Sequence, residues 1–268
     1  MANFSDKIVV ITGGSDGIGK ALVQQFLALG AKVATCGRNA QKLSVLVEEN
    51  PQAQLFTMPV DVVNQAQVEE FVQAVAKHWG GVDILINNAG ISMRALVSEV
   101  SIETLKNVMD INFWGTVYTT KAALPFVQKA NGVIVGVSSI AGYRGLPGRS
   151  GYSASKYALN GWLEALRTEL YGSGTHVMWV CPGFTSSNIR NAALNKDAQA
   201  QGESPMDEGA MMSSEVCAQH IINAIAKRKR SLVLTFTGKR TVFMNKFFPG
   251  WADKLAYHFF FKNGKLVK

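Results

Sequence analysis

Several residue types and patterns are scarce in this 268-residue sequence, and each absence excludes a class of protein. It contains three widely spaced cysteines, Cys36, Cys181 and Cys217, and four scattered histidines. This excludes a disulfide framework and any recognisable metal-ligand spacing. No apolar run approaches the roughly 18 residues of a membrane span, and the N-terminus lacks the basic region of a signal peptide. These absences predict a cytoplasmic protein with reduced thiols and no metal.

Acidic residues are almost absent from the end of the chain. Residues 1–226 hold 16 Lys and Arg against 18 Asp and Glu, whereas residues 227–268 hold 11 against one. The same C-terminal segment carries nine of the 25 aromatic residues. The net charge of +8 therefore belongs to this segment and not to the chain as a whole.

Strand-like and helix-like patterns alternate along the sequence. Apolar runs predict strands at or within 7–12, 32–36, 54–62, 82–90, 132–139, 175–183 and 231–236. Helical spacing predicts helices at 18–30, 40–50, 64–80, 102–128, 152–171 and 214–229. This alternation is typical of an α/β fold with a doubly wound, mostly parallel sheet and helices on both faces. We expect one domain over 1–238, with a substrate loop at 186–213, and a short helical extension over 239–268.

The first loop has a glycine pattern suited to phosphate. The segment TGGSDGIG, residues 12–19, lies between the first predicted strand and helix. Gly13, Gly17 and Gly19 allow a tight turn, a close backbone approach and tight helix packing, and the helix N-terminus then faces a pyrophosphate. The position between a strand and a helix makes a dinucleotide site the favoured interpretation over an ordinary glycine-rich turn.

The end of the second strand indicates which dinucleotide is preferred. Folds that select NAD usually place Asp or Glu there to bind the ribose 2′-hydroxyl. This sequence has Gly37 in that place, followed by Arg38, whose guanidinium matches a 2′-phosphate. NADP(H) is therefore favoured over NAD(H). Asp16 counts against this preference, because it adds an anion near the phosphates.

The segment GYSASKYALNGW, residues 151–162, places Tyr152 and Lys156 four residues apart on a predicted helix. A tyrosine with a pKa of about 10 is a poor acid or base at neutral pH. A neighbouring cation would favour the phenolate and lower that pKa. The pair thus fits a tuned general acid, although a surface Tyr–Lys pair has the same spacing.

With these motifs in order, the sequence resembles the short-chain dehydrogenase/reductase family over at least residues 5–235. It looks most similar to the hydroxysteroid dehydrogenase and ketosphinganine reductase branch. The matching motifs are TGGSDGIG, Asp61-Val62, NNAG at 87–90, Asn112 in MDINFWG, VSS ending at Ser139, YSASK at 152–156 and PG at 182–183. The resemblance implies a Rossmann-type fold and a homodimer or homotetramer.

The resemblance also implies catalytic roles. Tyr152 would act as general acid and base, and Lys156 would lower the pKa of Tyr152 and hold the nicotinamide ribose. Ser139 would hydrogen-bond the substrate oxygen. Asn112 would bend its helix and hold a water that relays protons to Lys156.

The same resemblance implies a set of cofactor contacts. Asp61 would accept from the adenine amino group, and the residues after Pro182 would face the nicotinamide. The implied cofactor-binding residues are Gly13, Ser15, Asp16, Gly17, Ile18, Gly19, Gly37, Arg38, Asp61, Val62, Asn88, Ala89, Gly90, Tyr152, Lys156, Pro182, Gly183, Thr185 and Ser187.

The substrate is expected to be lipophilic, such as a steroid, a sphingoid base or a fatty ketone. Apolar residues that the sequence places near the site are Met93, Leu96, Tyr143, Leu146, Pro147, Ile189, Leu194, Met206, Met211 and Met212. No clustered cationic site for a carboxylate or phosphate is evident. Four arginines are nevertheless close in sequence, and they would change this expectation if they reached the site: Arg94, Arg144, Arg149 and Arg190.

Three alternatives remain open at this point. The chain could be a catalytically idle NADP(H)-binding regulatory protein, although its Asn–Ser–Tyr–Lys set is intact. It could also be an epimerase or dehydratase on the same fold, although little room is left for a larger substrate domain. The third alternative concerns 239–268. Its aromatic residues and lysines fit peripheral membrane contact or a subunit interface. Nucleic acid is not expected, because KRKR at 227–230 fits a helix C-terminus.

Overall fold

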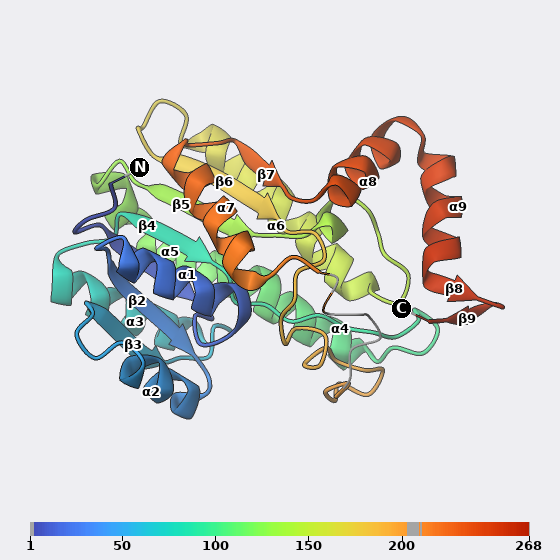
Figure 1. Cartoon of the computed structure of the whole chain (residues 1–268), viewed down its shortest axis with the longest axis horizontal. Helices are drawn as coiled ribbons and strands as arrows, with labels where there is room; N and C mark the ends of the chain where they lie inside the picture. Colours follow the sequence, from blue (N-terminus) through green and yellow to red (C-terminus); the bar gives the residue numbers. More distant parts are fainter. Residues whose placement is uncertain (1–2, 203–208, 210, 268) are drawn as a thin grey trace.

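The computed structural model describes residues 3–202, 209 and 211–267. Within these residues, seven parallel strands form one sheet in the order β3-β2-β1-β4-β5-β6-β7 (Figure 1). The strands are β1 (Ile8–Thr12), β2 (Lys32–Gly37), β3 (Leu55–Pro59), β4 (Ile84–Asn87), β5 (Val133–Val137), β6 (His176–Cys181) and β7 (Ser231–Val233). The predicted parallel sheet is confirmed. The order reverses direction between β1 and β4, where such sheets bind ligands.

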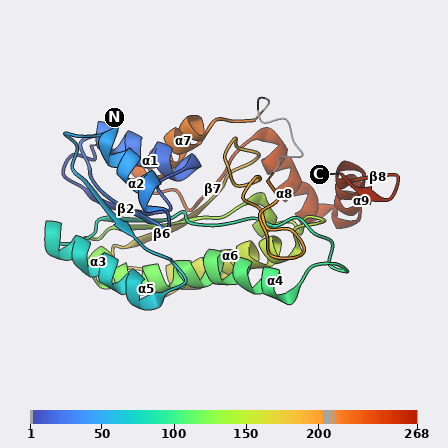
Figure 2. The ribbon, with the colours of Figure 1, turned by 90° about the horizontal axis from the view of Figure 1, so that it is seen from below.

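Helices cover both faces of the sheet, as predicted (Figure 2). One face carries α1 (Gly17–Ala28), α2 (Ala40–Glu48) and α7 (Ser214–Ala226). The other carries α3 (Gln65–Trp79), α4 (Ile102–Met109), α5 (Gly115–Lys129) and α6 (Ser150–Glu169). The two apolar layers between helices and sheet explain why most strands are buried on both sides.

Side chains at the helix ends explain where the helices begin and stop. Asn64 accepts from the backbone N–H of Gln67 and so caps α3, and Asp16 accepts from Gly17 N at the start of α1. Such caps satisfy N–H groups that have no partner inside the helix. Gly80, with φ of 94°, ends α3 in the left-handed region that glycine tolerates.

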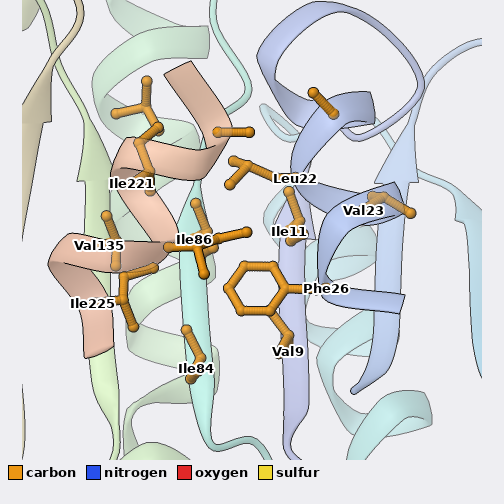
Figure 3. Close-up of a cluster of buried hydrophobic side chains, with 14 of the residues drawn as sticks. Val9, Ile11, Leu22, Val23, Phe26, Ile84, Ile86, Val135, Ile221 and Ile225 are labelled. Carbon is orange, nitrogen blue, oxygen red and sulfur yellow. The ribbon is translucent and has the colours of Figure 1, made fainter. Parts of the chain in front are cut away.

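The core on the α1 and α7 face is centred on Phe26 (Figure 3). Its ring lies among branched side chains from β1, β4 and α7, including Val9, Ile86 and Ile225. Phe26 is fully buried, as is Ile86. Burial of each such side chain contributes about 1.5–3 kcal/mol. The carboxyl ends of β1 and β4 are thereby held rigidly below the glycine-rich loop.

The predicted strand over 231–236 is shorter in the structure, because Thr235 caps a helix there by accepting from Gly238 N at 3.0 Å. That helix is α8 (Phe236–Phe247), and α9 (Pro249–Phe260) follows it. A short hairpin, β8 (Phe261–Lys262) and β9 (Lys265–Leu266), was not predicted. Figure 1 shows that α8 and α9 stand beyond the end of the sheet.

The extension formed by α8, α9 and the β8–β9 hairpin is tied to the segment that follows β5. Arg144 forms an ion pair with Asp253 at 2.6 Å and donates to Asn245 at 3.0 Å. Asn245 in turn donates to Tyr143 O at 2.7 Å. These contacts fix α8 and α9 against the residues just beyond Ser139.

None of the helices described for this chain combines the length and the apolar character that crossing a bilayer requires.

Candidate functional site

A single large cavity of about 1060 Å³ runs from the glycine-rich loop, along the carboxyl ends of the strands, to α8 and α9. All the sequence-predicted site residues except Asn112 line this cavity. They are Gly13, Ser15, Asp16, Gly17, Ile18, Gly19, Gly37, Arg38, Asp61, Val62, Asn88, Ala89, Gly90, Ser139, Tyr152, Lys156, Pro182, Gly183, Thr185 and Ser187. Residues far apart in the sequence therefore share one site. Whether they bind the groups expected of them stays a prediction.

The glycine-rich loop has the tight geometry that its sequence predicts. Gly13 and Gly17 have φ of 69° and 51°, values that favour glycine. A Cβ on Gly19 would lie 2.1 Å from Gly13 O, so any larger residue would push helix and loop apart. Gly17, Ile18 and Gly19, at the start of α1, line the cavity, and a helix N-terminus in this place suits a phosphate group.

The loop after β4 is bonded to the glycine-rich loop. Asn88 donates from Nδ2 to Thr12 O at 3.0 Å and to Gly13 O at 3.1 Å. Thr12 Oγ1 accepts from the backbone N–H groups of Asn88 and Ala89, both at 3.0 Å. Asn88 thus holds the glycine-rich loop and the loop after β4 together at this end of the cavity.

The cationic end of the cavity contains a residue that sequence reasoning missed. Arg38 is exposed there and has no hydrogen bond or ion pair with any described residue. Lys42, from the first turn of α2, lines the same part of the cavity and forms an ion pair with Asp16. This pairing offsets the negative charge that counted against a 2′-phosphate. The sequence position of Lys42, three residues after Asn39, which caps α2, could have indicated that Lys42 lies in the first turn of this helix, near Arg38.

Tyr152 and Lys156 lie on α6, as predicted, but both are buried, with 9% and 4% exposure. This excludes the surface-pair interpretation. Lys156 donates from Nζ to Val137 O at 2.9 Å, and Nζ lies 5.6 Å from the centre of the Tyr152 ring. Ser139 lies two residues after the end of β5, and its hydroxyl interacts with that of Tyr152. Its Oγ also accepts from Ala141 N at 3.2 Å, which fixes its orientation.

Burial dominates the protonation of this group. Desolvation raises the pKa of Tyr152, while the Ser139 hydroxyl and the Arg149 and Arg190 charges oppose the rise. Desolvation lowers the pKa of Lys156 to about 8. Lys156 is not among the groups that oppose this rise, and its Nζ bonds to the Val137 carbonyl, so the expected lowering of the Tyr152 pKa by Lys156 stays a prediction. With its pKa raised, Tyr152 stays protonated at neutral pH.

Asn112 lies behind the cavity, in a π-helical turn at Asp110–Trp114 between α4 and α5. The π-helical turn interrupts the regular helix at Asn112, whereas the expected bend of the helix stays a prediction. The side-chain amide of Asn112 accepts from Ile91 N at 2.8 Å and donates to Ile91 O at 2.9 Å. It also donates to Ser155 Oγ at 3.0 Å. Asn112 thus joins the loop after β4 to α6, while the water relay stays a prediction.

The turn after β6 packs closely against Thr235, the residue that caps α8. A Cβ on Gly183 would lie 2.4 Å from Thr235 Oγ1, so glycine is needed where the two segments meet. Cys181, just before this turn, is buried, and desolvation raises the pKa of its thiol to about 12. It is therefore a poor nucleophile.

The apolar part of the cavity differs from the expectation. The loop at 186–213 was expected to supply a Met-rich wall, but the described wall comes mainly from α8 and α9. The residues concerned are Met244, Ala252, Leu255, Phe259 and Phe260, together with Leu146 and Ile189. Met93 is buried in the core, Tyr143 accepts from Trp179 Nε1 at 2.9 Å, and Met206 lies outside the described residues. Residues outside this wall are Leu96, Pro147, Leu194, Met211 and Met212.

The expectation of no cationic cluster is also wrong. Arg144, Arg149, Arg190 and Arg240 all line the cavity. Arg144 and Arg149 are close in the sequence, before and at the start of α6, whereas Arg190 comes from the loop after β6 and Arg240 from α8. Among the residues with assigned positions, no group of three or more His, Cys, Asp or Glu could hold a metal ion.

A doubly wound sheet with a glycine-rich loop and a buried Tyr–Lys pair in one cavity defines a Rossmann-type oxidoreductase. The family model for short chain dehydrogenases matches residues 7–198. The chain therefore belongs to the short-chain dehydrogenase family, and the predicted family and fold are confirmed.

Relatives and solved structures agree with this assignment. Dehydrogenase/reductase SDR family member 7B of Mus musculus is 34% identical over 257 residues, 93% of this chain and 80% of its own length. The 11-beta-hydroxysteroid dehydrogenase 1A of Arabidopsis thaliana is 33% identical, over 85% of this chain and 68% of its own. A short-chain dehydrogenase from Streptomyces avermitilis has a similar structure, with a TM-score of 0.82, 25% identity and coverage of 95% and 96%. One from Burkholderia phymatum, in complex with NAD, has a TM-score of 0.83 at 24% identity, covering 92% and 95%.

Proposed function

We propose that the protein is an NADP(H)-dependent oxidoreductase that interconverts a carbonyl and a secondary alcohol. The observation that carries the proposal is the burial of protonated Tyr152 in the same cavity as the glycine-rich loop. A buried phenol with a raised pKa is a proton donor for a carbonyl oxygen. The NAD complex of the Burkholderia phymatum relative supports a dinucleotide in this cavity as part of the proposal.

Each residue of the group has a distinct task in the proposed reaction. The nicotinamide, when bound, supplies a hydride for reduction or takes one up in oxidation. Tyr152 gives its proton to the carbonyl oxygen, so that hydride and proton together form the alcohol. Ser139 donates to the same oxygen and stabilises the charge that develops there. Lys156 holds the ribose hydroxyls through Nζ.

The proposed preference for NADP(H) rests on the cationic end of the cavity. Arg38 offers a guanidinium without an ion-pair partner in the described chain, and Lys42 neutralises Asp16 beside it. A 2′-phosphate would therefore meet net positive charge. The cofactor-bound relative shows NAD in a different chain, so this preference needs its own test.

The proposed substrate has a lipophilic part. This follows from the apolar wall that α8 and α9 contribute, including Met244, Leu255 and Phe259. We further propose that residues 1–238 form the dinucleotide-binding and catalytic domain and that 239–268 is an appended segment. In this arrangement the appended segment completes the substrate side.

The test is NADPH consumption with steroid, sphingoid, sugar and short aliphatic carbonyls, with Tyr152→Phe as the control. Turnover of at least one carbonyl that the control loses supports the proposal. Tight NADPH binding without turnover of any carbonyl would instead support the idle regulatory protein. Product formation without net NADPH consumption would support an epimerase or a dehydratase.

We also propose that the extension contacts an anionic membrane surface. Its aromatic side chains that are at least half exposed are Phe236, Phe243, Phe247, Phe248, Trp251 and Tyr257. Exposed lysines at 239, 246 and 254 accompany them. Aromatic residues with interleaved lysines suit the interface of a bilayer, and a lipophilic substrate would be reached from there. A homodimer or homotetramer interface is the alternative that the test must separate.

A further inference from the structure

Arg149 is a buried cation without a counterion. Its side chain is 8% exposed and lines the cavity. No hydrogen bond or ion pair joins its guanidinium to any residue of the described chain, and its Nε lacks a partner. Arg144 provides the contrast, because Asp253 and Asn245 both bind it.

The backbone holds Arg149 firmly in this position. Arg149 N donates to Leu146 O at 3.1 Å, and Arg149 O accepts from Ser153 N at 2.8 Å. A parallel bridge to Ala95 supports the other side. Arg149 directly precedes α6, and its charge acts on the Tyr152 hydroxyl, so the two side chains lie within interaction range. The Arg149 backbone is therefore held in place, and its buried side chain carries the charge close to the proposed proton donor.

Other cations surround Arg149. Arg190, 7% exposed, donates from Nη2 to Thr185 O at 2.7 Å. Desolvation lowers the pKa of Arg149, and the charges of Arg190 and Arg94 lower it further, against the opposing influence of Tyr152. An unpaired buried charge is costly, and like charges nearby increase the cost. Tyr152 is not the missing counterion, because its raised pKa keeps it neutral at neutral pH.

We propose that Arg149, with Arg190 beside it, binds the carboxylate or phosphate head group of an amphiphilic carbonyl substrate whose apolar chain lies against α8 and α9. The reacting carbonyl must reach the Tyr152 hydroxyl, so only a few bonds separate it from the anion. Met244, Leu255 and Phe259 line the part of the cavity left for the chain. This inference rests on the proposed function and narrows its lipophilic substrate to an anionic one.

The first test measures binding and needs no turnover. Full-length protein is titrated by calorimetry with decyl phosphate, decanoate and decan-1-ol, each below its micelle concentration. A charge-assisted contact predicts that one of the two anions binds about 10- to 150-fold more tightly than the alcohol. The tighter of the two identifies the head group. Equal affinity for all three ligands overturns the inference.

Variants then assign the preference to Arg149. Arg149→Met should abolish the preference for the anion, and Arg149→Lys should keep part of it by retaining the charge without the planar fork. Lys77→Met removes one exposed charge from α3 and should change nothing. A preference that survives in Arg149→Met contradicts the assignment. If Arg149→Met fails to fold, Arg149→Lys is used instead: a partial loss of the preference for the anion supports the assignment, and an unchanged preference contradicts it.

The second test separates this inference from the proposed function. NADPH consumption is compared for 4-oxododecanoate and its methyl ester, with wild type and Arg149→Met. A higher kcat/KM for the acid, lost in the variant, supports the inference. Equal turnover of acid and ester in both proteins overturns the anion site but leaves the oxidoreductase intact. Anion binding without turnover of any carbonyl supports the anion site and overturns the proposed oxidoreductase activity.

Discussion

The sheet region and the C-terminal extension differ in almost every physical respect. Every residue of β1 is buried, whereas the α8 and α9 residues that are buried are Gly238, Ala252 and Phe260. The family match ends at residue 198, so the extension lies outside it. The sheet region carries the glycine-rich loop and Tyr152, and the extension adds the apolar wall. On the proposed function, the chemistry and the choice of substrate would therefore come from different parts of the chain.

The largest effect should come from the sheet region. Tyr152→Phe keeps the ring and removes the proton donor, so we expect kcat to fall by about 10²–10⁴-fold. NADPH binding, measured by fluorescence titration, should change little. A variant that keeps more than about a tenth of the wild-type kcat would show that another group donates the proton.

A pair of phenylalanine substitutions sharpens the comparison through stability. Phe26→Ala leaves a cavity between α1 and the sheet and should cost about 3–5 kcal/mol of unfolding free energy. Phe247→Ala, on the extension, removes a side chain that is 56% exposed and should cost within about 0.5 kcal/mol. Urea unfolding measures both. Similar costs would mean that the extension is packed in the assembled protein.

The sheet region could be predicted from the sequence, because both its local residue patterns and the order of its motifs indicate the strands, helices and loops that form it. The β-branched runs, the glycine spacing and the helix caps such as Asn64 are short-range signals. The extension's two helices were also readable from the Pro249–Gly250 break. Their position against Tyr143 and Arg144 was not, because hydrogen bonds about a hundred residues apart in the chain determine it.

The arginine cluster shows the same limit at the site. Arg149 and Arg190 are 41 positions apart in the sequence, and neither belongs to a motif. Their shared cavity follows from the meeting of the α6 N-terminus with the loop after β6. Sequence patterns reveal which residues are present, but only packing decides that the Arg149 guanidinium is buried in the cavity without a counterion among the described residues.

Cofactor choice is the next test and concerns the far end of the cavity. Arg38→Ala should raise KM for NADPH about 10- to 150-fold more than KM for NADH, the weight of a charge-assisted contact. Gly37→Asp should shift preference towards NADH. A Cβ at Gly37 would come no closer than 3.4 Å to Ser15 Oγ, which leaves room for the side chain. Equal effects of Arg38→Ala on both cofactors would exclude a role in reading the phosphate.

The pH dependence of kcat/KM should report the loss of the Lys156 proton. Its pKa is lowered to about 8, so it loses its proton as pH rises through 8, while Tyr152 with its raised pKa stays protonated. We expect kcat/KM for NADPH in the reduction to be level below pH 8 and to fall above it, approaching tenfold per pH unit. Lys156→Arg keeps the charge and should remove this break. An unchanged break in that variant assigns it to another group.

The smallest expected effect belongs to the extension's surface. Each Lys near an anionic bilayer adds about 1 kcal/mol, or roughly fivefold in binding. Lys246→Gln and Lys254→Gln should each weaken flotation with anionic vesicles by that factor, and Phe247→Ser should weaken it independently of salt. Lys77→Gln, on α3, is the matched control and should have no effect. Wild-type protein that stays unbound at low salt refutes the membrane proposal. If Phe247→Ser instead changes the mass measured by sedimentation, the exposed aromatic residues form a subunit interface. The C-terminal extension would then differ from the sheet region because it assembles subunits, and not because it contacts a membrane.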